Sequence, residues 1–138
     1  MNLIGVIAAL TAFFSIWFGH VAVRKIEFIS QTIWIPTLIF ATLGLITEYC
    51  SLSTVNHPLS TFFGILGITF LFDALEFIRQ QNRIKKGHAP ANLNNPRHVR
   101  ILAEHSSATT IDLLKREPVG SLLPAGEGDP KGRVREKP

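Results

Sequence analysis

The sequence predicts an all-α membrane protein with three transmembrane helices and a basic, largely irregular cytoplasmic tail. Two apolar stretches carry this prediction: residues 3–23 hold no formal charge, and residues 26–78 hold no lysine or arginine. A spanning helix needs about 20 mostly apolar residues, so these stretches have room for three spans. A soluble three-helix bundle is the alternative, but soluble helices have a polar face, and residues 3–23 have no charged position on any face.

The totals allow one domain plus a tail. Residues 1–78 have a net charge of −2 and residues 79–138 one of +6, so the basic character belongs to the tail. The lone cysteine, Cys50, excludes an internal disulfide and a cysteine-based metal cluster. Because no basic residue precedes the first apolar stretch, it lacks the start of a signal peptide, and we expect it to be a retained span.

The three spans are expected at about residues 3–23, 29–47 and 59–77. A tight hairpin at residues 24–27 should join the first two, and Asn56-His57-Pro58 is typical of a helix start. The third helix should continue to about residue 86 and end at Gly87.

These elements divide the chain into a transmembrane domain, residues 1–87, and a basic cytoplasmic tail, residues 88–138. Within the tail, a short helix is expected at residues 110–117, between a threonine cap and Pro118. Lysine and arginine accumulate on the cytoplasmic side of membrane proteins. They occur in the first loop and the tail and not in the second loop, which places the N-terminus outside, the C-terminus in the cytoplasm, and the protein in the cytoplasmic membrane.

Small residues recur at alternating spacings of three and four along the first and third spans. In lipid, close backbone approach through small residues supplies much of the packing energy between helices. The seam is explained either by packing of the three spans on one another or by an oligomer or partner interface. Its members are Gly5, Ala8, Ala12, Ser15, Gly19, Ala22, Ser60, Gly64, Gly67 and Ala74.

Ionisable residues gather where the spans approach the cytoplasm. This inner-leaflet cluster consists of His20, Arg24, Lys25, Glu27, Asp73, Glu76 and Arg79. Ionisable groups within spans are costly and often functional, so a proton relay through His20 and Asp73 is one interpretation. The other is a cluster of mutually satisfied charges at the interface. This second interpretation is favoured because no carboxylate lies at the middle of the bilayer.

Basic residues follow the third span directly: Arg79, Arg83, Lys85 and Lys86. Next to a membrane they are expected to contact anionic lipid headgroups. Nucleic-acid binding is disfavoured because the basic run has no interleaved aromatic residues. We find no catalytic motif, and expect no enzymatic activity, cofactor or metal; Glu48 and His57 beside the second loop offer only two ligands.

The chain also resembles a family of small bacterial membrane proteins catalogued as domain of unknown function 4491. The resemblance rests on the stretch from Gly19 to Phe28, on Trp34 and Pro36, and on a closing motif. That motif comprises Glu76 through Gln80, Arg83, Ile84, Lys86, Gly87, Pro90, Asn92 and Pro96. The resemblance covers about residues 2–96 and implies the membrane topology without implying a mechanism.

Three hypotheses for function remain. The first is a non-enzymatic structural or accessory subunit that packs against a larger membrane complex. The second is a small homo-oligomeric transporter or proton-conducting element that uses the inner-leaflet cluster. The third is a membrane-anchored adaptor whose basic tail recruits a soluble protein.

Overall fold

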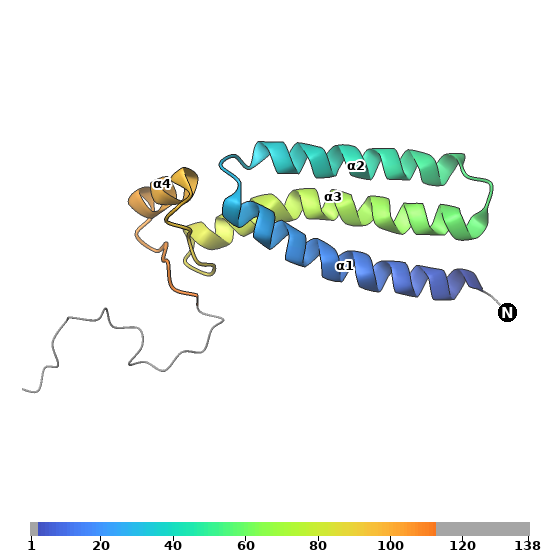
Figure 1. The fold of residues 1–138 in the computed structure, drawn as a ribbon, viewed down its shortest axis with the longest axis horizontal. Helices are drawn as coiled ribbons and strands as arrows, with labels where there is room; N and C mark the ends of the chain where they lie inside the picture. Colours follow the sequence, from blue (N-terminus) through green and yellow to red (C-terminus); the bar gives the residue numbers. More distant parts are fainter. Residues whose placement is uncertain (1–2, 113–138) are drawn as a thin grey trace, which may run out of the picture.

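The computed structural model describes residues 3–112, and within that range four helices and no strand are found. They are α1 (Leu3–Ile29), α2 (Trp34–Ser53), α3 (His57–Lys85) and α4 (Pro96–Glu104). α1, α2 and α3 are long and apolar enough to cross a membrane. α3 lies between the other two and packs along both, as Figure 1 shows. The three helices therefore form an open layer in which α1 and α2 each have α3 as their main neighbour.

The connection between α1 and α2 lies further along the chain than the sequence predicted. α1 continues through residues 24–27 to Ile29, and the connection consists of residues 30–33, so the hairpin prediction was wrong. Arginine, lysine and glutamate are good helix formers, and charge at a membrane boundary does not require the backbone to turn. α2 begins at Trp34, with Pro36 in its first turn, where the missing N–H has no intrahelical partner to lose.

α3 has clear signals at both ends. Asn56 caps its start, with its side-chain oxygen accepting a hydrogen bond from the Leu59 N–H at 3.1 Å, and Pro58 lies in the first turn. The helix ends at Lys85, and Gly87 then has a φ of 72°. A side chain at Gly87 would be strained in this conformation and would also run into the Ser107 carbonyl. Only glycine suits this turn.

The predicted small-residue seam is used unevenly. A Cβ at Gly19 would collide with the Asp73 carboxylate of α3, and one at Gly67 would lie 2.8 Å from Glu48 Oε1 of α2. Gly64 faces Ser51 of α2 in the same way. Gly5, by contrast, has no atom of the described residues within 4 Å of its Cβ position. The seam thus closes α1 on α3 near Gly19, and α2 on α3 at Gly64 and Gly67, but it is open at the start of α1.

The other seam positions lie between these extremes. Ala74 is buried, whereas five positions are half-buried: Ala8, Ala12, Ser15, Ala22 and Ser60. The Ser15 and Thr69 hydroxyls are 3.2 Å apart across α1 and α3. Ser51 and Ser60 each donate a hydrogen bond to the other's carbonyl, at 2.8 and 2.9 Å, beside the α2–α3 loop. Short polar side chains therefore add direct bonds to the close helix contacts.

The segment after α3 is more ordered than the predicted irregular tail. Residues 87–109, here called the cap, contain α4 and fold back beside the ends of α1 and α3 (Figure 1). A hydrophobic core forms there from Ile84, Ala89, Ala91 and Ile101. α4 lies in the segment predicted to be irregular, and it begins at Asn95-Pro96, a cap followed by proline in the first turn. Of the predicted helix at 110–117, residues 110–112 are not helical and the rest lie outside the described residues.

Candidate functional site

The charges predicted to form one inner-leaflet cluster have different partners at the cap end of the helices, although Asp73 is close enough to His20 and Glu76 to interact with both electrostatically. Glu27 lies with residues of the cap, Glu76 lies with arginines of α3, and Asp73 lies against α1. Arg24 and Lys25 line a cavity.

Glu27 is 1% exposed and is bound by two cap residues. Arg97 Nη2 donates to Glu27 Oε1 at 2.7 Å and to the Glu27 carbonyl at 2.8 Å. His98 Nε2 lies 3.1 Å from the same carboxylate oxygen, and His98 is fully buried. Buried charges require pairing and hydrogen bonds, and the carboxylate of Glu27 obtains both. We call Glu27, Arg97 and His98 the Glu27 site.

The hydrogen bonds define the tautomer of His98. The backbone N–H of Asn92 donates to His98 Nδ1 at 2.9 Å, so Nδ1 is the acceptor and the proton lies on Nε2. Nε2 then donates to Glu27 Oε1, beside Arg97 Nη2 at 3.0 Å. Two donors therefore converge on one carboxylate oxygen, and the Glu27 site contains one positive and one negative charge with a neutral imidazole.

Two asparagines of the cap close the C-terminal end of α1. Asn95 Nδ2 donates to the carbonyls of Phe28 at 3.2 Å and Ser30 at 2.9 Å, and Asn92 Nδ2 donates to that of Phe28 at 3.0 Å. The last carbonyls of a helix lack intrahelical partners. Asn95 also caps α4, since its side-chain oxygen accepts from the Arg97 N–H at 3.0 Å. One side chain thus terminates α1 and starts α4.

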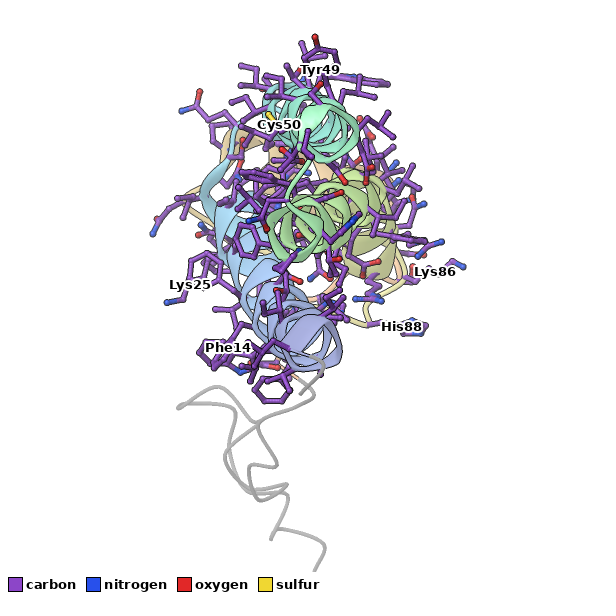
Figure 2. The ribbon with its side chains drawn as sticks, turned by 90° about the vertical axis from the view of Figure 1, so that its right-hand side faces the viewer. Phe14, Lys25, Tyr49, Cys50, Lys86 and His88 are labelled. Carbon is purple, nitrogen blue, oxygen red and sulfur yellow. The ribbon has the colours of Figure 1, made fainter. Side chains whose placement is uncertain are left out.

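Glu76 is paired within α3. Arg83 Nη2 lies 2.9 Å from Glu76 Oε1, and Arg79 Nη1 lies 3.6 Å from Oε2. Two of the four residues predicted to contact lipid headgroups therefore have a carboxylate partner in the same helix. Lys85 and Lys86 follow at the end of α3. Figure 2 shows Lys86 and His88 on one flank of the molecule and Lys25 on the other.

Asp73 lies where α1 and α3 approach most closely. It is 6% exposed, its carboxylate contacts the Gly19 backbone position, and its Oδ2 has no hydrogen-bond partner among the described residues. His20, the other member of the predicted relay, is exposed on α1. A carboxyl group buried between two helices without a bound donor is the most unusual polar feature of the spans.

Arg24 and Lys25 are exposed on α1 and line a cavity of about 720 Å³. Its other walls come from the apolar residues of α1, from Gln80 of α3, and from the cap and the residues after it. Arg24 and Lys25 do not take part in the Glu27 site, although Glu27 lies one helical turn away and also borders the cavity.

Glu48 and His57 belong to different surroundings. Glu48 lies against Gly67 of α3, and His57 is exposed at the start of that helix. Among residues 3–112 no group of three or more histidine, cysteine, aspartate or glutamate side chains is placed to hold a metal ion.

Sequence reasoning found Glu27 and missed its partners. Arg97 and His98 lie 70 and 71 residues further along the chain, in a segment that the sequence analysis treated as tail. A usable signal was present: Asn95-Pro96 is a cap followed by proline in the first helical turn, and Ile101 follows at an interval that places it on the same face as Arg97 and His98.

Three long apolar helices in one layer, with the lysines and arginines of the described residues at one end, define a small multi-pass membrane protein of the helical class. Residues 2–95 match the family described as a domain of unknown function (DUF4491), and the chain belongs to this family. The match includes Glu27, Asn92 and Asn95, and it ends before Arg97. No curated protein and no solved structure matches the chain.

Proposed function

We propose that the chain is a non-enzymatic structural or accessory subunit of a larger membrane complex. Its spans pack against a partner in the cytoplasmic membrane, with the N-terminus outside and the cap in the cytoplasm. The orientation is supported by Arg24, Lys25 and the basic residues of α3 and the cap, all at one end, whereas the α2–α3 loop has no lysine or arginine.

The open start of α1 carries this proposal. α1 crosses α3 near the cap and diverges from it toward the N-terminus (Figure 1). The small-residue seam nevertheless continues there through Ala8 to Gly5, whose Cβ position has no neighbour within 4 Å. Small residues allow another helix to approach closely, and this part of the seam is free to receive one.

Purification of the full chain from native membranes in mild detergent, followed by quantitative mass spectrometry, tests the proposal. We expect a membrane-protein partner in stoichiometric amount. Gly5→Leu should reduce its recovery, because a large side chain blocks close approach. Leu10→Phe, which enlarges an exposed side chain on the opposite side of α1, should not. Recovery of the chain alone, or equal loss in both variants, would contradict an assembly role for the seam.

A second candidate is a proton-conducting homo-oligomer, and buried Asp73 is the observation that favours it. Among residues 3–112 its Oδ2 has no hydrogen-bond partner, which leaves the carboxyl group able to take up and release a proton. In proteoliposomes, Asp73→Asn should abolish any proton flux that the parent protein shows. A parent protein without flux eliminates this candidate.

Copurification also separates the adaptor hypothesis from the other two. A soluble partner that is lost when residues after the cap are removed would support an adaptor. A self-oligomer without other proteins would support the proton-conducting candidate.

A further inference from the structure

The face of α1 that leads to the cavity combines an apolar stripe with two basic residues. Phe14, Phe18, Val21, Lys25 and Phe28 follow one another at spacings of three or four, which places them on one side of the helix. Phe14 and Phe18 are exposed, and Figure 2 shows Phe14 and Lys25 on the same flank. Phe14, Phe18 and Val21 lie within the apolar span, and Lys25 and Phe28 continue the stripe at its charged end.

The cavity begins where the stripe ends. Val21, Phe28 and Ile29 form its apolar wall, and Arg24 and Lys25 provide its cations. Two acidic residues also border the cavity. The charge of Glu27 is already paired with Arg97, at 2.7 Å. Asp112 borders the cavity from the segment that follows the cap. The volume of about 720 Å³ is in the range of small-molecule sites, and the arrangement joins an apolar surface to a basic end.

We propose that this cavity binds the phosphate-bearing headgroup of an anionic lipid, with one acyl chain along Phe14, Phe18 and Val21. Arg24 and Lys25 form charge-assisted hydrogen bonds to the phosphate. Their position at the end of the apolar run of α1 is the depth at which headgroups lie. The site depends on the membrane placement of α1 and not on the proposed assembly role.

The two flanks of the molecule supply a matched comparison. Arg24 and Lys25 lie on the cavity flank, and Lys85 and Lys86 are a second pair of basic neighbours, with Lys86 on the opposite flank (Figure 2). General attraction to an anionic membrane treats the two pairs alike, because it depends on charge near the surface. A specific lipid site at Arg24 and Lys25 requires this pair more than it requires Lys85 and Lys86.

Native mass spectrometry of the full chain in detergent, titrated with phosphatidylglycerol, is the direct test. We expect one tightly bound lipid, with phosphatidylcholine of the same chains binding about 10-fold more weakly. The double change Arg24→Gln/Lys25→Gln should weaken phosphatidylglycerol binding about 10-fold, and Lys85→Gln/Lys86→Gln less than about 2-fold. Equal effects of the two double changes would overturn the site.

A second experiment adds inorganic phosphate as a competitor, because phosphate shares the chemistry of the headgroup but lacks acyl chains. Phosphate should not displace the bound lipid at millimolar concentration, and displacement would assign the cavity to a soluble anion instead. Photo-crosslinking with a phosphatidylglycerol analogue keeps the test independent of the variants. We expect labelling between residues 14 and 28, and labelling confined to the end of α3 would refute the proposal.

Discussion

The spans and the cap use the same kinds of residue in opposite ways. Where the cap packs on the end of α3, Ile84 of α3 and Ile101 of the cap are 1% and 4% exposed and form part of a hydrophobic core. In the spans, Phe18 of α1 and Leu38 of α2 are 68% and 69% exposed. Water drives apolar side chains together, whereas lipid tails solvate them as well as another side chain does. The cap is therefore held by apolar burial, and the spans by close approach of small residues.

The hydrogen bonds of the spans and of the cap also differ, in how far apart along the chain their partners lie. Within the spans, hydroxyls often bond to a carbonyl one turn back, as Thr37 does to Ile33 at 2.8 Å and Thr69 to Ile65 at 2.8 Å. In the cap, side chains bond across long sequence separations, as Arg97 does to Glu27. In lipid each backbone group is satisfied inside its own helix. The end of α1, next to the cap, is satisfied by another segment.

Arg97→Ala should give the largest effect, because it leaves the Glu27 carboxylate buried without its cation. Loss of one partner of a buried ion pair costs about 3–5 kcal/mol. We expect the free energy of opening the cap to fall by that amount, measured by hydrogen exchange of residues 87–109 in detergent. Arg100→Ala, an exposed change on the same helix, is the control and should have little effect. Similar exchange in both variants would show that the Glu27 site does not hold the cap.

Ile101→Ala tests the apolar contrast between the regions. Truncation of a buried isoleucine in the cap should cost about 2–5 kcal/mol. Leu38→Ala removes the same number of carbon atoms from a lipid-facing position and should change stability by no more than about 0.5 kcal/mol. Thermal unfolding of the two variants in the same detergent compares them. Equal destabilisation would mean that Leu38 packs against protein rather than lipid.

Gly19→Ala tests the close contact in the spans. The added methyl group would collide with the Asp73 carboxylate, and overpacking of this kind costs about 1–3 kcal/mol. Gly5→Ala makes the same change in open space and corrects for helix propensity. SDS-driven unfolding in mixed micelles should separate the two. The double variant Gly19→Ala/Asp73→Ala should recover much of the loss, and no recovery would contradict the contact.

Asn95→Ala should have the smallest effect, about 1 kcal/mol, because it removes a helix cap. Asn95→Asp keeps the oxygen that accepts from the Arg97 N–H but loses the donor to Phe28 and Ser30. Hydrogen exchange should therefore show α4 protected and the end of α1 exposed in the aspartate variant. Uniform exposure of both ends would mean that the two roles are inseparable.

Much of the spanning region could be predicted from local sequence. The apolar run from Leu3 is contained in a single helix, and the Asn56-His57-Pro58 start acts within one turn; each corresponds to a helix in the structure. The Glu27 site was harder to predict from the sequence. Charges between two apolar runs predict a hairpin at residues 24–27, whereas Glu27 stays helical with its charge paired to Arg97.

The sequence by itself determined the class of protein and the three apolar helices, because hydropathy and helix signals act between near neighbours. The tertiary structure alone decided that α3 lies between α1 and α2, that Gly5 faces open space while Gly19 contacts Asp73, and that the cap closes on Glu27. The last of these joins groups 70 residues apart. Such a contact depends on where the chain returns after leaving the spans, and no local pattern encodes that position.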